Sequence, residues 1–160
     1  MKILVVSDTH KGFSPLLELA LRYNGKIDML IHLGDGKDDI DDLTSALPDL
    51  PIRAVCGNCD WASLNPYTDI VSAGGAKIFI CHGHQFGVDR TLDRLASEAK
   101  RLGASAALFG HTHCQHYSEL FGVQCINPGS LCKPRDGKHG YAILEIVNGV
   151  VNCSLQRLDD

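Results

Sequence analysis

Close to its N-terminus, the chain reads Ile3-Leu4-Val5-Val6-Ser7-Asp8-Thr9-His10, a continuous apolar run that ends directly in polar side chains. A short aliphatic and β-branched run of this kind is typical of a buried β-strand. Asp8 and His10 are two residues apart, so both side chains leave the end of the predicted strand on the same side. A carboxylate and an imidazole in this arrangement are candidate ligands of a metal ion.

Four later segments repeat this arrangement, because each follows an apolar run and carries imidazole, carboxylate or amide groups. They are Gly34-Asp35, Gly57-Asn58-Cys59-Asp60, His82-Gly83-His84 and Gly110-His111-Thr112-His113. Their glycines allow the backbone to turn sharply and to pass close to bound ions. A single motif of this kind is weak evidence. The five segments together supply the nitrogen and oxygen ligands that two neighbouring divalent cations need.

The first half of the chain alternates predicted strands with predicted helices. Apolar runs at residues 3–6, 29–33 and 52–56 are separated by segments with apolar residues at helical spacing. This order predicts a parallel sheet with right-handed crossovers, whose candidate ligands gather at the carboxyl ends of adjacent strands. We expect Ser14 to cap the first helix. We expect the acidic run at residues 38–42 to form a solvated face of the second helix rather than another cation site.

The second half of the chain is richer in strands. Gly74-Gly75 joins two apolar runs as a hairpin turn does, and a helix capped by Asp89 is expected after them. Further strands are expected at residues 106–109, 117–121, 123–126, 141–147 and 150–155. An α/β half followed by a strand-rich half predicts an α/β (α+β) fold, in which two mixed sheets pack face to face with helices outside. We expect one domain over residues 1–160.

Composition narrows the classes of function. The chain has 160 residues, of which 44% are hydrophobic, enough for a substantial core. Its formal net charge of −4, with scattered lysines and arginines, argues against binding of extended nucleic acid. No apolar run approaches the roughly 20 residues that span a bilayer, so no membrane association is expected and the predicted location is the cytoplasm. A small-molecule substrate is therefore the expected partner.

The seven cysteines form an odd set that lies mostly within apolar runs. This pattern is typical of reduced, buried thiols rather than of a disulfide framework. Cys56 and Cys59 also form a C-x-x-C pair, but no second pair with zinc-ribbon spacing exists. We therefore expect no independent zinc or redox site there.

Several residues outside these ligand motifs have simpler interpretations. His32 lies inside an apolar run, which favours a hydrogen-bonded core histidine. The segment Asn127-Pro128-Gly129-Ser130 predicts a tight turn. Trp61 and Phe86 follow motif segments, so they either line the rim of a pocket or pack against the core.

The ordered series of motifs, from Asp8-x-His10 to Gly110-His111-x-His113, resembles the calcineurin-like metallophosphoesterase superfamily. The short chain, the Asn58-Cys59-Asp60 sequence and Asn127-Pro128-Gly129-Ser130 resemble more closely its small bacterial and archaeal phosphodiesterases. The resemblance extends over residues 2–130. It implies a four-layer α-β-β-α sandwich with a dinuclear metal site between the sheet ends. The implied activity is hydrolysis of a phosphate ester, expected to be a small phosphodiester, and the segment at residues 127–130 is expected to brace the ligands.

The same resemblance implies two sets of metal ligands that share a bridging carboxylate. The expected ligands are Asp8, His10 and His113 on one metal, Asn58, His82 and His111 on the other, and Asp35 between them. A hydroxide held between two such ions is expected to attack phosphorus. The expected cofactors are two divalent cations, manganese first, with nickel, zinc, iron or magnesium as alternatives.

The resemblance leaves the general acid open. Many members of the superfamily carry histidine where this chain has Cys59, and a thiol with a pKa of about 8.5 is a poorer acid at neutral pH. Asn58, Cys59, Asp60 and His84 are the candidate catalytic residues. We expect His84 to contact the substrate phosphate and Asp60 to fix the turn or a ligand histidine.

Two other functions come from proteins that resemble this family. A retromer subunit has the same fold with a degraded metal site, so a non-catalytic protein-binding scaffold is the alternative. Every expected ligand position of this chain holds a competent residue, which disfavours that alternative. A nuclease resembling the larger relatives would need extra domains and a basic surface. The sequence does not name the native substrate or metals, and it leaves the oligomeric state open, a homo-oligomer included.

Overall fold

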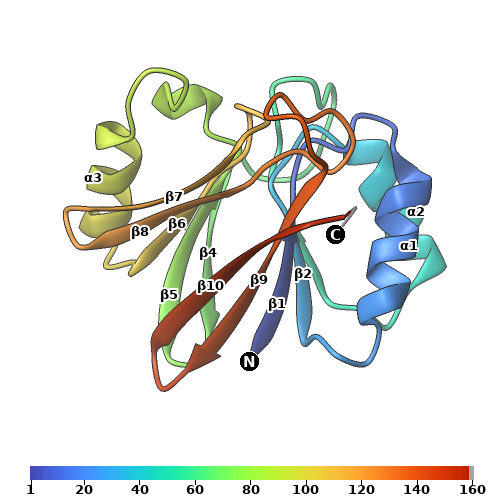
Figure 1. The fold of residues 1–160 in the computed structure, drawn as a ribbon, viewed down its shortest axis with the longest axis horizontal. Coiled ribbons are helices and arrows are strands. Elements are labelled where there is room, and N and C mark those ends of the chain that lie inside the picture. Colours follow the sequence, from blue (N-terminus) through green and yellow to red (C-terminus); the bar gives the residue numbers. More distant parts are fainter. Residues whose placement is uncertain (159–160) are drawn as a thin grey trace.

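The computed structural model describes residues 1–158, which form ten strands, three α-helices and one short 3-10 helix (Figure 1). The strands are β1 (Lys2–Val6), β2 (Met29–His32), β3 (Ile52–Ala54), β4 (Thr68–Ala73), β5 (Ala76–Cys81), β6 (Ala106–Leu108), β7 (Gln115–Leu120), β8 (Val123–Pro128), β9 (Gly140–Val147) and β10 (Val150–Arg157). The helices are α1 (Phe13–Tyr23), α2 (Lys37–Ala46) and α3 (Asp93–Arg101), with the 3-10 helix η1 at His84–Phe86. Each predicted strand and helix has its counterpart here.

The first sheet has the strand order β10-β9-β1-β2-β3. Its strands β1, β2 and β3 are parallel, with Val5 opposite Ile31 and Ile31 opposite Arg53. Helices α1 and α2 provide the two crossovers, as the alternation of patterns predicted. Strand β9 pairs antiparallel with β1, and β10 pairs antiparallel with β9, so the sheet is mixed.

The second sheet has the strand order β4-β5-β6-β8-β7. Strands β5, β6 and β8 are parallel, and the edge strands β4 and β7 are antiparallel to their neighbours. Gly74 and Gly75 form the hairpin turn between β4 and β5 with φ angles of +55° and +87°. Glycine adopts such angles without steric cost, which explains the predicted turn.

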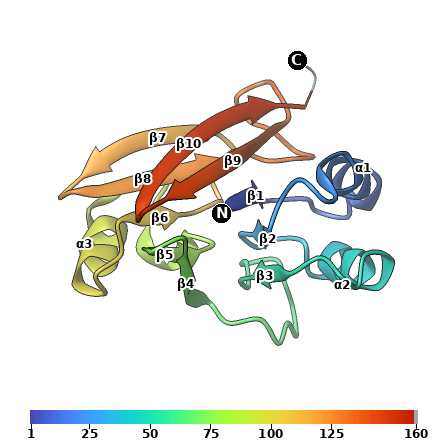
Figure 2. The same ribbon diagram turned by 90° about the horizontal axis from the view of Figure 1, so that it is seen from below.

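The two sheets lie face to face, with α1 and α2 outside the first sheet and α3 outside the second (Figure 2). One apolar cluster fills the space between the sheets, and two further clusters lie between each sheet and its helices. The predicted four-layer α-β-β-α sandwich is therefore confirmed.

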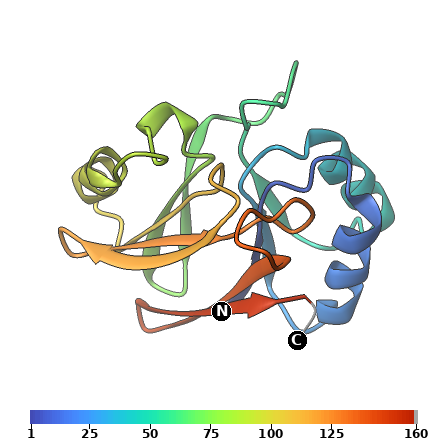
Figure 3. The same ribbon diagram turned by 45° about the horizontal axis from the view of Figure 1, so that its top comes forward.

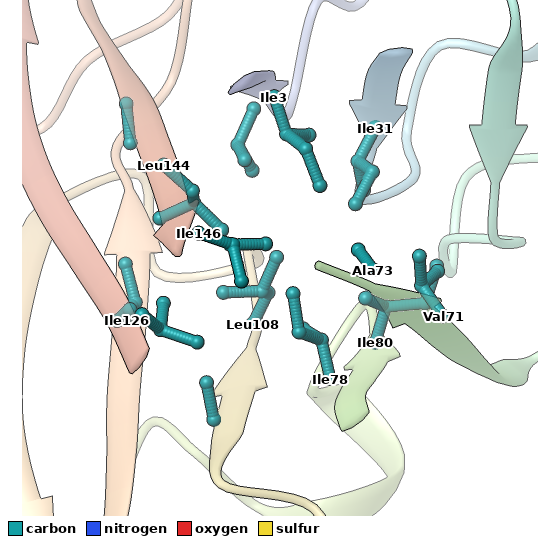
Figure 4. Close-up of a cluster of buried hydrophobic side chains, with 14 of the residues drawn as sticks. Ile3, Ile31, Val71, Ala73, Ile78, Ile80, Leu108, Ile126, Leu144 and Ile146 are labelled. Atoms are coloured by element: carbon teal, nitrogen blue, oxygen red, sulfur yellow. The ribbon is translucent and has the colours of Figure 1, made fainter. Parts of the chain in front are cut away.

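Strand β1 shows why the opening run is apolar at every position. Ile3 and Val5 belong to the cluster between the sheets, where Ile3 lies near Ile31 (Figure 4). Leu4 and Val6 belong to the cluster under α1 and α2. All four side chains of the run are fully buried, because the strand is covered on both faces.

Expectations drawn from composition can also be compared with the structure. All seven cysteines are free thiols in the structure, and Cys114, Cys132 and Cys153 are partly buried. Cys56, Cys81 and Cys125 are buried, whereas Cys59 is exposed. None of the helices within residues 1–158 has the length and hydropathy needed to cross a bilayer.

Three local expectations are wrong. Helix α1 begins at Phe13, so Ser14 lies inside its first turn and Gly12 occupies the cap position without a side-chain bond. Helix α3 begins at Asp93, well after Asp89, with Leu92 at its cap position. In neither helix does the residue at the cap position make a side-chain hydrogen bond.

The third error concerns Asp39, which is only 3% exposed instead of forming part of a solvated face. Its Oδ2 accepts hydrogen bonds from Thr9 Oγ1 at 2.5 Å and from the backbone N–H of Lys11 at 3.0 Å. Asp39 therefore ties the first turn of α2 to the segment after β1. The remaining carboxylates of the acidic run, such as Asp38 and Asp41, are exposed as expected.

His32, at the end of β2, is fully buried and hydrogen-bonded, as predicted for a core histidine. Its Nδ1 accepts the backbone N–H of Gly34 at 3.1 Å, which places the proton on Nε2. That nitrogen lies 3.1 Å from Thr9 Oγ1, to which it donates. Burial, opposed by nearby carboxylates, lowers the pKa of His32 to about 4.

This shift predicts an acid sensitivity of the fold. Because the folded pKa of His32 lies below the usual value of 6.5, the neutral ring stabilises the fold above pH 6.5, and this stability is lost as the pH falls toward 4. Between pH 6.5 and pH 4, we expect the free energy of unfolding of the metal-free wild type to fall by about 3 kcal/mol more than that of His32→Asn. Urea unfolding of both proteins across this range measures the difference. Parallel stability curves would exclude a buried neutral imidazole.

Candidate metal centre

The candidate ligands from both sheets come together at one end of the sandwich. The loops that follow β1, β2 and β3 lie there beside the loops that follow β5 and β6 (top of Figure 1, brought forward in Figure 3). Within the first sheet, the N–H of Asp8 donates to Gly34 O at 3.0 Å. Across the two sheets, the N–H of His111 donates to Asp8 Oδ2 at 3.1 Å. Backbone and side-chain hydrogen bonds thus join the loops into one site.

Asp8, His10 and His113 form the first donor cluster. Asp8 Oδ1 lies 3.1 Å from His113 Nε2 and 3.8 Å from His10 Nε2. The two Nε2 atoms are 3.2 Å apart. Ligand atoms that bind one ion at about 2.0–2.2 Å have similar separations, so this cluster fits a single cation.

Asn58, His82 and His111 form the second donor cluster. Asn58 Oδ1 lies 3.0 Å from His82 Nε2 and 3.0 Å from His111 Nδ1. The three residues follow β3, β5 and β6, so they come from both sheets. An amide oxygen with two imidazole nitrogens is a suitable set for a second divalent cation.

Asp35 lies between the two clusters. Its Oδ2 is 3.6 Å from His10 Nε2 and 3.5 Å from His82 Nε2. Its other oxygen, Oδ1, accepts the backbone N–H of Cys59 at 2.8 Å, which fixes the carboxylate in this orientation. One carboxylate oxygen of Asp35 therefore lies near donor atoms of both clusters.

The Asp8 carboxylate provides an independent test of whether a cation fits. Its Oδ2 accepts hydrogen bonds from Ser7 Oγ at 2.6 Å and from the N–H of His111 at 3.1 Å. Its Oδ1 is buried and has no hydrogen-bond partner within residues 1–158. A buried carboxylate oxygen without a donor is costly, and a bound cation removes that cost. The donor set therefore fits a metal ion at this position.

Two of the imidazoles are oriented by backbone carbonyls. Nδ1 of His82 donates to Leu33 O at 2.7 Å, and Nδ1 of His113 donates to Lys133 O at 2.7 Å. In each ring the proton is held on Nδ1, so Nε2 presents its lone pair to the donor cluster. The sequence carried no signal for Leu33 or Lys133, because the contributing groups are backbone oxygens.

The carboxylates and imidazoles shift one another's pKa values. Burial raises the pKa of Asp8, but the neighbouring His113 and His82 imidazoles outweigh it, and the net shift is downward. The pKa of Asp35 is also lowered, because its interactions with His82 outweigh burial. Burial lowers the pKa of His82, whereas Asp35 and Asp8 raise it by more. Both carboxylates are therefore ionised at neutral pH, the form that binds cations.

Backbone strain is concentrated at the same residues. Five of the seven expected ligands have positive φ angles: Asp8, His10, Asp35, His111 and His113. The angle is +58° at Asp35 and +69° at His111. Such conformations cost about 1–3 kcal/mol each for residues other than glycine, and they persist only where neighbouring structure imposes them. The fold therefore holds these side chains in strained conformations that direct them toward the two donor clusters.

Asp60 has a positioning role in this structure. Its Oδ1 accepts the N–H groups of Gly36 and Lys37, each at 2.9 Å, and its Oδ2 accepts those of Asp35 and Gly57, each at 2.8 Å. This carboxylate therefore holds the loop that carries Asn58 against the loop that carries Asp35. Of the two roles expected for Asp60, the structure shows the one that fixes the turn.

The segment Asn127–Ser130 braces two ligand loops, as the sequence indicated. Asn127 Nδ2 donates to Gly110 O at 2.8 Å, directly before His111. Ser130 Oγ donates to the backbone oxygen of Asp8 at 2.8 Å. A glycine is also required at position 57, because a Cβ there would lie 2.1 Å from Asp35 Oδ1.

Cys59 and His84 lie at the edge of the donor clusters. Cys59 can contribute its thiol to a group with His10 and Asp35, whose donor atoms lie within 4.8 Å of one another. The His84 ring lies 5.5 Å from that of His82 and 6.1 Å from that of His111, measured between centroids.

His116 and His139 lie outside the clusters. His116 bonds to Ser118 Oγ, and His139 bonds to Leu131 O.

Residues 1–149 match the sequence profile of the calcineurin-like phosphoesterase superfamily domain. The probable metallophosphoesterase YsnB of Bacillus subtilis is 37% identical over 150 residues, which cover 92% of this chain and 86% of that protein. The chain therefore belongs to the calcineurin-like phosphoesterase superfamily, and it is a metal-dependent phosphoesterase by family.

Two solved structures show the same fold. One is a conserved protein of Streptococcus pneumoniae described as a predicted phosphoesterase, with 30% identity, a TM-score of 0.86, and coverage of 99% of this chain and 90% of that one. The other is Vps29 of Entamoeba histolytica complexed with Zn²⁺, with 24% identity, a TM-score of 0.72, and coverage of 98% and 99%. The second likeness shows the fold alone.

The four bonds to Asp60 predict a large effect of its removal. We expect Asp60→Ala and Asp60→Asn each to lower the free energy of unfolding by about 2–4 kcal/mol, because both leave backbone N–H groups without an acceptor. Asp41→Ala, which removes an exposed carboxylate paired with Lys37, should cost less than about 1 kcal/mol. Urea unfolding of the metal-free proteins measures these values. Wild-type stability in Asp60→Asn would show that the carboxylate does not hold the loops.

Proposed function

We propose that this protein is a phosphodiesterase that hydrolyses a small phosphodiester with two divalent cations, one in each donor cluster. The observation that carries the proposal is the position of Asp35 Oδ2, 3.6 Å from His10 Nε2 and 3.5 Å from His82 Nε2. When bound, such a pair of cations would neutralise the charge of the phosphoryl oxygens and lower the pKa of bound water, so that hydroxide is available near neutral pH to attack phosphorus.

A pocket of about 330 Å³ beside the clusters supports binding of an anionic ester. His10, Asp35 and Cys59 form part of its wall. Lysines also line it, namely Lys11, Lys37 and Lys133. Lys37 is paired with Asp38 and Asp41, so Lys11 and Lys133 are the ones we assign to attracting the phosphate.

We assign to His84 the contact with the phosphate. Its Nδ1 is buried without a hydrogen-bond partner within the described residues, and its ring stands beside those of His82 and His111. Burial and these two histidines lower the pKa of His84. The ring is therefore neutral at pH 7, and it contributes a hydrogen bond rather than a charge.

Cys59 is a weak candidate for the general acid. Desolvation and the neighbouring Asp35 carboxylate raise the pKa of the Cys59 thiol, so the thiol holds its proton too tightly to protonate a leaving oxygen near pH 7. Esters with stable leaving groups, which need no proton, are therefore the substrates that this site should turn over fastest.

The preference for a diester rests on the charge around the clusters. Within the part of the chain that the structure describes, neither the pocket lined by His10 and Asp35 nor the pocket lined by Asn58 has an arginine in its wall, although Arg90 and Arg94 line a third pocket together with His84. Arginine is the residue that binds the dianion of a monoester through two parallel hydrogen bonds. The single negative charge of a diester suits Lys11 and Lys133 better than the double negative charge of a monoester does.

The alternative function is a non-catalytic protein-binding scaffold of the retromer-subunit type. The observation in its favour is the likeness of the fold to Vps29. Against it, all seven expected ligand positions hold donors that converge on two points.

We propose manganese as the metal, because mixed imidazole and carboxylate ligands suit it, with nickel, zinc, iron and magnesium as alternatives.

A metal add-back assay tests the proposal. Chelator-treated protein is given Mn²⁺, Ni²⁺, Zn²⁺, Fe²⁺ or Mg²⁺ and assayed on bis(4-nitrophenyl) phosphate and on 4-nitrophenyl phosphate. We expect Mn²⁺ to restore turnover, with the diester favoured at least tenfold. Asp35→Ala should lose at least 100-fold in activity, because both clusters lose a ligand.

Asp41→Ala is the matched control, since it removes a carboxylate on the exposed face of α2. It should keep wild-type activity. Failure of every metal to restore turnover of either ester, together with less than one equivalent of metal bound, would favour the scaffold.

A further inference from the structure

A second pocket, of about 280 Å³, opens beside Asn58 and His84. Trp61 and Tyr67, from the loop between β3 and β4, form part of its wall. These two side chains are 87% and 63% exposed. Large exposed aromatic rings on the wall of a pocket offer a flat apolar surface that a ligand can cover. Phe86, the other candidate for a pocket rim, does not line this pocket; it packs edge-on against Phe79 and lines a separate pocket.

The loop that carries Trp61 and Tyr67 is held at both ends. At its start, the Asp60 carboxylate accepts four backbone N–H groups. At its end, Pro66 O accepts the N–H of Cys56 at 2.8 Å, and Tyr67 O accepts a hydrogen bond from Gln85 Nε2 at 3.0 Å. The two rings therefore stand on a fixed backbone, which lowers the entropic cost of binding a ligand between them.

The pocket is continuous with the second donor cluster. Asn58 belongs both to that cluster and to the pocket wall. His84 closes the same wall, with its ring edge-on to Tyr67 at 6.3 Å between centroids. A phosphate group at the clusters therefore brings one of its ester substituents to this pocket.

The charge and size of the pocket indicate what that substituent is. Among the described residues that line it, Asp60 is the one carboxylate, and its oxygens are already occupied by the four N–H groups. The Asp60 carboxylate keeps its negative charge but is bound to backbone N–H groups, so Trp61 and Tyr67 supply the large aromatic surface of the wall. A cavity of about 150 Å³ is enough to bind benzene, so this pocket has room for a larger planar ring.

We propose that the pocket formed by Trp61, Tyr67 and His84 binds a planar aromatic substituent of the phosphate ester, a nucleoside base or an aryl group. This assignment rests on the proposed function, because it places the ester phosphate at the donor clusters. Leu64 supplies a matched control. It lies on the same loop and is fully exposed, yet it does not line the pocket.

Steady-state kinetics of the metal-loaded protein are the first test. We expect Trp61→Ala to raise KM about fivefold or more for bis(4-nitrophenyl) phosphate and for a thymidine dinucleotide, since stacking on an aromatic side chain is lost. For glycerophosphoethanolamine, a diester without a ring, KM should change less than about twofold. Leu64→Ala should match the wild type on all three. If the rise in KM is larger for bis(4-nitrophenyl) phosphate, the ring is an aryl group. If it is larger for the thymidine dinucleotide, the ring is a nucleoside base.

Fluorescence of the metal-free protein is the second test, and it does not depend on turnover. Trp61 is the one tryptophan of the chain, so its emission reports directly on the pocket. We expect saturable quenching by adenosine monophosphate and by phenyl phosphate, and none by ribose 5-phosphate. Saturable quenching in a protein that hydrolyses no ester would support the pocket assignment while overturning the phosphodiesterase proposal.

Three results would overturn the pocket assignment. Trp61→Ala could change KM equally for esters with and without a ring. The three phosphates could quench Trp61 to the same extent. Leu64→Ala could reproduce the effect of Trp61→Ala, which would make the whole loop a surface for a protein partner.

Discussion

One carboxylate faces imidazoles from both sheets, and the rest of the structure depends on that arrangement. Asp35 Oδ2 lies 3.6 Å from His10 Nε2, after β1 of the first sheet, and 3.5 Å from His82 Nε2, after β5 of the second. These distances require that parallel strands of two separate sheets end at the same edge. The apolar cluster between the sheets sets their spacing, so core packing and ligand geometry are coupled.

The site is costly to maintain in the folded protein. Five of its residues have positive φ angles, and Asp8 Oδ1 is buried without a hydrogen-bond donor within the described residues. Hydrogen bonds from elsewhere hold these conformations, notably those of Asp60 to four backbone N–H groups and that of Ser130 to Asp8. A ligand that binds only the folded state stabilises it, so bound cations would offset part of this loss of stability.

The sequence predicted the strands and the meeting of the five motifs, because continuous apolar runs mark strands covered on both faces. It did not predict the burial of Asp39, and it gave the turn-fixing role of Asp60 only as one of two roles, since the partners of both carboxylates include backbone N–H groups of segments distant in sequence. The same limit applies to the carbonyl of Lys133 that orients His113. The sequence left open whether Trp61 lines a pocket or packs against the core, because the pocket wall depends on the path of the loop.

We propose that Asp35 joins two cations in one centre. Electron paramagnetic resonance of metal-free protein titrated with Mn²⁺ tests it most directly, because two manganese ions that share a carboxylate give an exchange-coupled signal. We expect binding to saturate at two equivalents with that coupled signal. Saturation at one equivalent, or two ions without coupling, would contradict the claim.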